Sequence, residues 1–176
     1  MKHIIFILLL TFTSSLYAKH KTTKIEDPFA KAYSYEIGET VAMDKEKAKE
    51  LYIVSCNLGN MQACFNLGTM YAYGYGIKQN KRIAEGLYYR ACKYGFADGC
   101  FNLGKMYCNG DGVKKSKKDS KKAYVKGCAL EQREACFNLG LFYLKKSKEQ
   151  SKKMFLKSCD LGDADACNNY NILDSD

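Results

Sequence analysis

The sequence contains very little histidine, and this scarcity restricts its chemistry. Only two histidines, His3 and His20, occur among the 176 residues, so imidazole catalysis and histidine-bound metals are nearly excluded. No two cysteines are spaced C-x2-C, the pattern typical of zinc sites. No pair of titratable residues suggests acid/base catalysis. The sequence therefore predicts neither a metal site nor a cofactor.

A long hydrophobic run is also missing. The longest run, from Ile4 to Phe12, covers about half of the ~20 residues that a membrane-spanning helix needs. Lys2 precedes it, and small and polar residues follow as far as Ala18, a pattern typical of a secretory signal peptide. We expect cleavage after Ala18 and an exported chain, periplasmic or secreted. Since Lys19 follows rather than a cysteine, a lipoprotein is not expected.

Cysteine, in contrast, is abundant. Eight of the nine cysteines fall into four C-x7-C pairs, the first in "CNLGNMQACFNLG" at 56–68. Eight residues of one helix rise about 12 Å, whereas a disulfide needs Cα atoms within roughly 7 Å. If Gly59 and Asn60 break the helix into a hairpin, the two cysteines face each other near the turn. An oxidising compartment favours disulfides over a cytosolic thiol cluster.

The cysteine pairs mark an internal repeat. Similar segments begin at Cys56, Cys92, Cys128 and Cys159, at intervals of 36, 36 and 31 residues. Apolar residues recur at helical spacing before the first cysteine and after the second, which predicts two antiparallel helices per repeat. A lone hairpin cannot bury both faces, so neighbours must stack. The predicted fold class is all-α, an α/α solenoid of four helical hairpin repeats with an N-terminal capping helix.

The predicted organisation follows these repeats. Links "GYGI" at 74–77 and "GDGV" at 110–113 supply residues that can take positive φ, and such a link is missing from the shortened third repeat. The expected segments are a signal peptide at 1–18, a flexible N-terminus at 19–27, a capping helix at 28–46, repeats at 47–82, 83–118, 119–150 and 151–173, and a tail at 174–176.

The recurring Ala and Tyr positions, the turn glycine, "FNLGxxY" and "GxGV" resemble the Sel1-like repeat family, a relative of the tetratricopeptide repeats. With a C-x7-C pair in every repeat and a signal peptide, the chain is similar to the Helicobacter cysteine-rich (Hcp) proteins. The match covers roughly residues 28–173. It departs from the pattern in the short third link, at Glu131 where the other repeats have glycine, and at the unpaired Cys108.

The resemblance implies a disulfide in each repeat, with zinc as the disfavoured alternative. Each bond closes a loop of nine residues, for which the chain-entropy model gives about 2.5 kcal/mol. The implied pairs are Cys56 with Cys64, Cys92 with Cys100, Cys128 with Cys136, and Cys159 with Cys167.

Cys108 has no partner in this scheme. It aligns with Ala72 and Leu144, which favours a small buried apolar residue. The alternative is an exposed free thiol that forms a dimer, whereas a monomer is otherwise expected.

Positive charge is concentrated in the second half of the chain. The formal net charge is +9, and residues 114–153 contain 13 Lys and Arg against four acids. The runs "KKSKKDSKK" and "KKSKEQSKK" occupy equivalent links, so we expect them on one edge of the solenoid. That edge is either simply solvated or a surface for an acidic or phosphate-rich partner. Nucleic acid is not expected, and the basic edge is represented by Lys117, Lys118, Lys121 and Lys122.

Asparagine recurs at one position of the second helices. Because asparagine favours caps and turns, its repetition needs a reason. One interpretation is a structural hydrogen bond between helices, and the other is a row of amides that clamps an extended peptide. The residues are Asn66, Asn102 and Asn138, with Asn169 in the last repeat.

The resemblance also implies an activity, because β-lactam binding and slow β-lactam hydrolysis are ascribed to the Hcp family. No serine here is followed by lysine in S-x-x-K spacing, and "KTG" and "SDN" are absent. The predicted function is therefore a scaffold for a protein, a peptide or a peptidoglycan-derived cell-wall fragment on its concave face. A β-lactam-hydrolysing enzyme is the alternative, and an effector acting on host cells is a third hypothesis.

Overall fold

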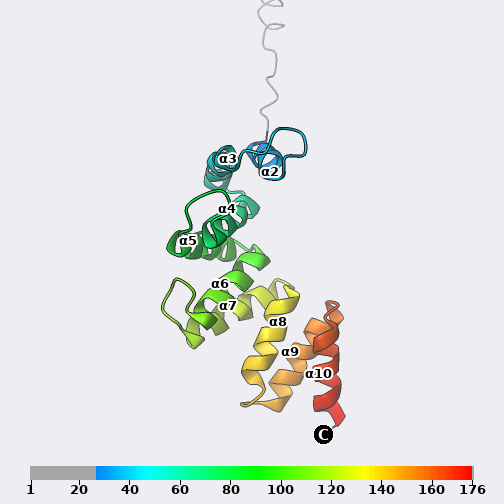
Figure 1. The fold of residues 1–176 in the computed structure, drawn as a ribbon. Coiled ribbons are helices and arrows are strands. Elements are labelled where there is room, and N and C mark those ends of the chain that lie inside the picture. Colours follow the sequence, from blue (N-terminus) through cyan, green and yellow to red (C-terminus); the bar gives the residue numbers. More distant parts are fainter. Residues whose placement is uncertain (1–26, 176) are drawn as a thin grey trace, which may run out of the picture.

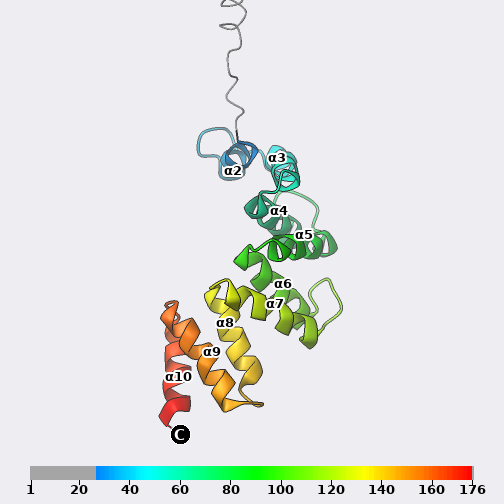
Figure 2. The ribbon, with the colours of Figure 1, turned by 180° about the vertical axis from the view of Figure 1, so that it is seen from behind.

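The computed structural model describes residues 27–175, which form nine helices and confirm the predicted all-α class. Each helix packs on the next in an elongated, bowed stack (Figures 1 and 2). The predicted signal peptide and nearly all of the predicted flexible N-terminus lie outside the described residues. The helices are α2 (Pro28–Ile37), α3 (Lys45–Asn57), α4 (Met61–Tyr73), α5 (Lys81–Lys93), α6 (Ala97–Asn109), α7 (Lys117–Ala129), α8 (Arg133–Tyr143), α9 (Lys148–Asp160) and α10 (Ala164–Ser175).

The odd-numbered helices all begin in the same way. A polar N-cap side chain accepts a hydrogen bond from the backbone N–H three residues further on, which satisfies one of the unpaired donors of the first turn. The backbone N–H of the same N-cap donates to the carbonyl of a tyrosine at the end of the preceding helix, at 2.8–3.0 Å. These two hydrogen bonds at each N-cap fix each odd-numbered helix on the helix before it. The N-caps are Asp44, Asn80, Ser116 and Ser147.

The even-numbered helices end at glycine wherever the link contains one. Gly38, Gly74 and Gly110 follow α2, α4 and α6 with φ of 74°, 73° and 76°, a conformation that glycine adopts without steric cost. Helix α8 has no such glycine and ends at Leu144 in a right-handed conformation. The tight turn that follows accounts for the shorter third interval.

Both ends differ from the predicted boundaries. Helix α2 stops at Ile37 instead of filling 28–46, because Gly38 turns the chain and Asp44 already caps α3. At the other end, α10 continues to Ser175 through most of the predicted tail. Asp174 lies 2.5 Å from the ammonium group of Lys152, which ties this last turn to α9.

Two kinds of helix interface alternate along the stack. Between α4 and α5, α6 and α7, and α8 and α9, a glycine lies flat against an aromatic ring. A Cβ added to it would come within 3.0 Å of the ring for Gly68, 2.5 Å for Gly104 and 2.7 Å for Gly140. Between α3 and α4, and at each equivalent place, a disulfide joins the helices and the packing is less extensive.

The turn inside each hairpin needs a left-handed residue. Gly59, Gly95 and Gly162 take it with φ of 96°, 92° and 91°, while Glu131 takes it in the third hairpin with φ of 62°. A side chain in this region costs roughly 1–2 kcal/mol. Glu131, which replaces the glycine of the other repeats, is thus a strained backbone position.

Within residues 27–175, no helix is both long and apolar enough to cross a membrane.

Candidate functional site

Each of the four hairpins has one disulfide, which joins its two helices near the turn. The Cα atoms of the bonded cysteines are 4.4–4.7 Å apart, and the bonds are Cys56–Cys64, Cys92–Cys100, Cys128–Cys136 and Cys159–Cys167.

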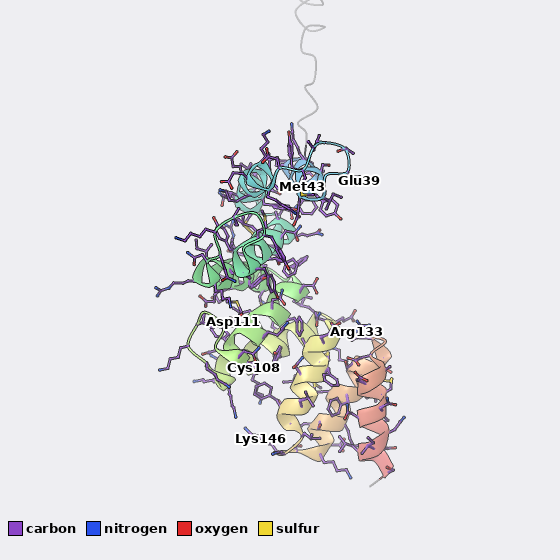
Figure 3. The ribbon with its side chains drawn as sticks, viewed as in Figure 1. Glu39, Met43, Cys108, Asp111, Arg133 and Lys146 are labelled. Atoms are coloured by element: carbon purple, nitrogen blue, oxygen red, sulfur yellow. A yellow bond between two sulfur atoms is a disulfide. The ribbon has the colours of Figure 1, made fainter. Side chains whose placement is uncertain are left out.

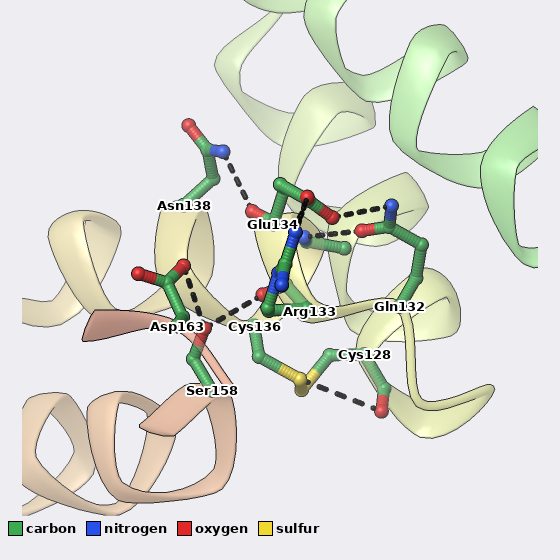
Figure 4. Close-up of a disulfide and its surroundings, with 9 residues drawn as sticks. Cys128, Gln132, Arg133, Glu134, Cys136, Asn138, Ser158 and Asp163 are labelled. Carbon is green, nitrogen blue, oxygen red and sulfur yellow. Dashed lines mark hydrogen bonds and ion pairs between the residues drawn. A yellow bond between two sulfur atoms is a disulfide. The ribbon is translucent and has the colours of Figure 1, made fainter. Parts of the chain in front are cut away.

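The third disulfide lies within a polar network that links three helices (Figure 4). The Ser158 hydroxyl of α9 donates to the carbonyl of Arg133 in α8 at 2.8 Å. Arg133 pairs with Glu134 at 2.8 Å, and Gln132 donates to the same carboxylate at 2.7 Å. Although burial alone would raise the pKa of Glu134, the hydrogen bonds from Arg133 and Gln132 outweigh it and lower that pKa. These contacts are structural, because each partner is already satisfied.

The asparagine row contacts the protein itself. The Asn66 amide donates to the hydroxyl of Tyr52, on the preceding helix, at 3.0 Å. Asn102 lies close enough to the Tyr88 hydroxyl to lower its pKa, although burial is the larger cause and raises that pKa overall. Asn138 instead donates to the carbonyl one turn back in its own helix, at 2.7 Å. The three amides therefore do not form one uniform row, and the first two match the inter-helix alternative.

The four lysines of the predicted basic edge divide between different surroundings. Lys117 and Lys118 are exposed at the start of α7. Lys121 lies over the ring of Tyr143 with its nitrogen 4.5 Å from the ring centre, a cation–π contact. Lys122 turns to the other side, where it lines a groove between α5 and α7.

That groove consists of two adjoining hollows, and we call it the α5–α7 groove. The larger hollow, about 790 Å³, lies beside the α6–α7 loop, which carries Asp111 in Figure 3. The smaller, about 290 Å³, lies between the bodies of α5 and α7. Tyr107 and Asp119 line both hollows and so join them.

Two acids line the α5–α7 groove, and both are hydrogen-bonded. The Tyr107 hydroxyl donates to Glu85 at 2.5 Å, and burial together with this carboxylate raises the pKa of Tyr107. The Ser116 hydroxyl donates to Asp119 at 2.6 Å, which holds the pKa of Asp119 below its usual value. Six cationic side chains also line the groove: Arg82, Lys93, Lys114, Lys115, Lys122 and Lys126.

An exposed apolar row accompanies this groove. The residue three positions before the first cysteine of each repeat is apolar in all four copies, and its side chain is 38–54% exposed. These residues lie on equivalent places of the odd-numbered helices. The apolar row consists of Ile53, Tyr89, Val125 and Leu156.

Neither the groove nor the row was predicted from the sequence. The row left a signal, because an exposed position that stays apolar in four copies departs from the polar face expected of an amphipathic helix. The groove has no such signal in the sequence, since it depends on the distance between α5 and α7.

Two serines of the described residues are held in the core between helices. Ser120 and Ser151 are fully buried and donate to the carbonyls of Gly104 and Gly140 at 2.9 Å. In the described part of the chain, no three His, Cys, Asp or Glu side chains are grouped to hold a metal.

Cys108 is half-buried on α6 and carries the free thiol of the described residues (Figure 3). It lies close enough to Tyr124 to affect the pKa of that hydroxyl, although burial is the larger cause of its rise to about 12. A dimer through Cys108 stays a prediction.

The chain matches the Sel1 repeat at residues 30–60, 62–95, 97–124 and 133–163. It therefore belongs to the Sel1 repeat family, whose repeats typically mediate protein binding. The matched units begin one helix earlier than the cysteine-based repeats, so each pairs an even-numbered helix, α2 included, with the following odd-numbered one. The first two disulfides thus bond one matched unit to the next. The third bonds Cys128, which lies just after the third unit, to the fourth unit, and the fourth bonds the last unit to α10. No curated protein matches the chain.

Solved structures show the same relationship. The chain is similar to Helicobacter pylori cysteine rich protein B at 32% identity, covering 74% of this chain and 98% of that one with a TM-score of 0.58. A Sel1 repeat protein from Oxalobacter formigenes is 26% identical, with a TM-score of 0.73 and 79% of this chain covered. A protective antigen of uropathogenic Escherichia coli, c5321, is also 26% identical, with a TM-score of 0.73 and 81% covered. This chain spans 57% and 32% of the lengths of the last two.

Proposed function

We propose that this chain is a scaffold that binds a protein or peptide along the face formed by α3, α5, α7 and α9. The observation that carries the proposal is the apolar row, one exposed apolar side chain at the same place in each repeat. Single exposed apolar residues need no explanation, but a regular series on one face is typical of an interaction surface. A long partner reaches all four residues, whereas a small molecule reaches one.

Selection from a displayed random-peptide library against the oxidised chain tests this proposal. The enriched peptides are expected to bind at least tenfold more weakly when Tyr89 and Val125 of the row are both replaced by serine. The matched control replaces two equally exposed apolar residues of even-numbered helices, Tyr73 and Leu141, by serine. No enrichment at all, or an equal loss with the control, would contradict the proposal.

We further propose that the chain works outside the cytoplasm, as a periplasmic or secreted protein. Four disulfides are typical of proteins that fold in an oxidising compartment, and the chain is similar to a cysteine-rich Helicobacter protein. Fractionation of the producing cells, followed by sequencing of the mature N-terminus, checks both compartment and cleavage after Ala18. A cytoplasmic chain that retains residues 1–18 would contradict this.

An amide clamp for an extended peptide remains a second hypothesis for the half-buried asparagines. It predicts that Asn102→Ala and Asn138→Ala leave the unfolding midpoint unchanged and abolish peptide binding. A lower midpoint with binding retained would support the purely structural interpretation instead, as the Asn66 contact with Tyr52 suggests.

The β-lactam hypothesis rests on resemblance, and no described residue favours it. Titration of the oxidised chain with a penicillin, read by intact-mass spectrometry, tests it directly. A stable adduct or a hydrolysed product would restore the hypothesis, and mapping the adduct would identify the residue. If neither an adduct nor a hydrolysed product is found, protein, peptide and peptidoglycan-derived ligands remain as the candidates.

A further inference from the structure

We propose that the α5–α7 groove binds an acidic segment of a partner protein and seats one of its apolar side chains. This inference rests on the proposed function, since it names the partner chemistry at one part of the same face. It is carried by the shape of the groove, by its apolar floor and by its charge.

The smaller hollow has the floor that an apolar anchor needs. Leu103 of α6 and Ala123 of α7 form its base with only 4% and 6% of their surfaces exposed. Tyr89 of the apolar row forms a wall and is 54% exposed. At about 290 Å³, the hollow is at the lower limit of small-molecule sites. It suits a side chain that arrives on a larger partner.

The groove continues along both helices. On α7 the lining residues Asp119, Lys122, Ala123 and Lys126 follow the i, i+3, i+4, i+7 spacing of one helix face. Seven residues of helix span about 10 Å. On α5, Gly86 lies three residues before Tyr89, and an added Cβ there would meet no atom within 4 Å. The surface of α5 beside Tyr89 is therefore open, and an elongated segment has room to lie along it.

The charge of the groove determines the sign of the partner. The six cationic side chains face two carboxylates, and Glu85 and Asp119 already accept hydrogen bonds from Tyr107 and Ser116. Lys122 lies 3.5 Å from Asp119, a loose and exposed pair that contributes little. Like charges set this close favour an anionic partner and exclude a basic one.

The test uses three labelled synthetic peptides of equal length and fluorescence anisotropy with the full oxidised chain. One peptide alternates glutamate and leucine, the second has serine for leucine, and the third has lysine for glutamate. Only the first is expected to bind strongly. Its affinity should fall at least tenfold for K122E/K126E, and should fall with added salt.

The matched control is K148E/K153E, which makes the same charge change on α9, at exposed lysines outside the lining of the groove. Its affinity for the acidic peptide should stay within about twofold of the parent. An equal loss in both variants would overturn the inference in favour of diffuse attraction. Equal binding of the lysine peptide would also overturn it, as would binding of phosphatidylglycerol vesicles by the parent chain without binding of the acidic peptide.

Failure here and failure of the proposed function are distinguishable. If library peptides bind the apolar row and ignore K122E/K126E, the inference fails and the scaffold function stands. If no peptide binds at all, both fail together.

Discussion

The interfaces joined by disulfides and the interfaces closed by glycine differ in what holds them. At the glycine interfaces, the backbone of one helix lies so close to an aromatic ring of the next that Gly104 has no room for a methyl group beside Tyr124. At the disulfide interfaces the helices pack less extensively, and a covalent bond sits near each turn. Covalent bonds thus occur where packing contributes least. A solenoid in which each unit touches only its neighbours depends on every such interface.

The α5–α7 groove depends on both kinds of interface. Helix α5 is joined to α6 by Cys92–Cys100, and α6 packs on α7 through Gly104. The floor residue Leu103 lies on α6 between them. The distance between the groove walls is therefore set by one covalent and one packed interface, so breaking either one tests the comparison.

The largest effect is expected from the covalent interfaces. Replacing Cys128 and Cys136 together by alanine should lower the free energy of unfolding by about 2.5 kcal/mol, because the denatured chain gains loop entropy. Reduction of all four bonds should then cost about 10 kcal/mol, comparable to the whole stability of a typical domain. Urea titration followed by circular dichroism measures both changes. An oxidised and a reduced chain with equal midpoints would contradict this account.

At the glycine interfaces, Gly104→Ala should destabilise by about 2 kcal/mol, because the new Cβ lies 2.5 Å from the Tyr124 ring and forces it to move. The matched control is Gly86→Ala, also within a helix, where the added Cβ meets nothing within 4 Å. That control should stabilise by about 0.5–1 kcal/mol. Equal signs for the two substitutions would show that ring contact does not decide the outcome.

A smaller gain is expected at the strained turn beside the third disulfide. Glu131→Gly should stabilise by about 0.5 kcal/mol, because relief of the left-handed strain exceeds the entropy that glycine adds to the unfolded chain. Glu131→Ala keeps the strain and is the control. A gain in the alanine variant as large as in the glycine variant would point to charge rather than backbone.

The last prediction concerns alkaline pH at a glycine interface. Burial raises the pKa of Tyr124 to about 12, above the value near 10 of an unfolded tyrosine. Its contribution to stability is therefore fully present below pH 10 and is lost as pH rises towards 12, because the unfolded state gives up its proton first. Tyr124→Phe removes this hydroxyl and introduces phenylalanine, the residue found at the equivalent position of α9, Phe155. The variant should lose less thermal stability between pH 9 and 11 than the parent, and an unchanged pH profile would contradict this.

The fold could be predicted because each structural requirement repeats in the sequence. The cysteine period gave the hairpins, and the glycines at 74 and 110 gave the ends of α4 and α6. The helix with which each repeat unit begins could not be predicted, because the spacing of the cysteines is the same whichever of the two helices is counted first. The surface was harder still: Lys121 and Lys122 are sequence neighbours, yet one lies over Tyr143 and the other lines the groove.

The most direct test of the whole account is the affinity of the glutamate–leucine peptide for the oxidised chain and for the same chain after mild reduction. We expect binding by the oxidised chain, a loss of at least tenfold on reduction, and recovery on reoxidation, because without the four disulfides the helices that form the walls of the α5–α7 groove no longer stay packed together. Equal affinity in the two states, or no binding in either, would contradict the claim that covalent interfaces shape a binding face.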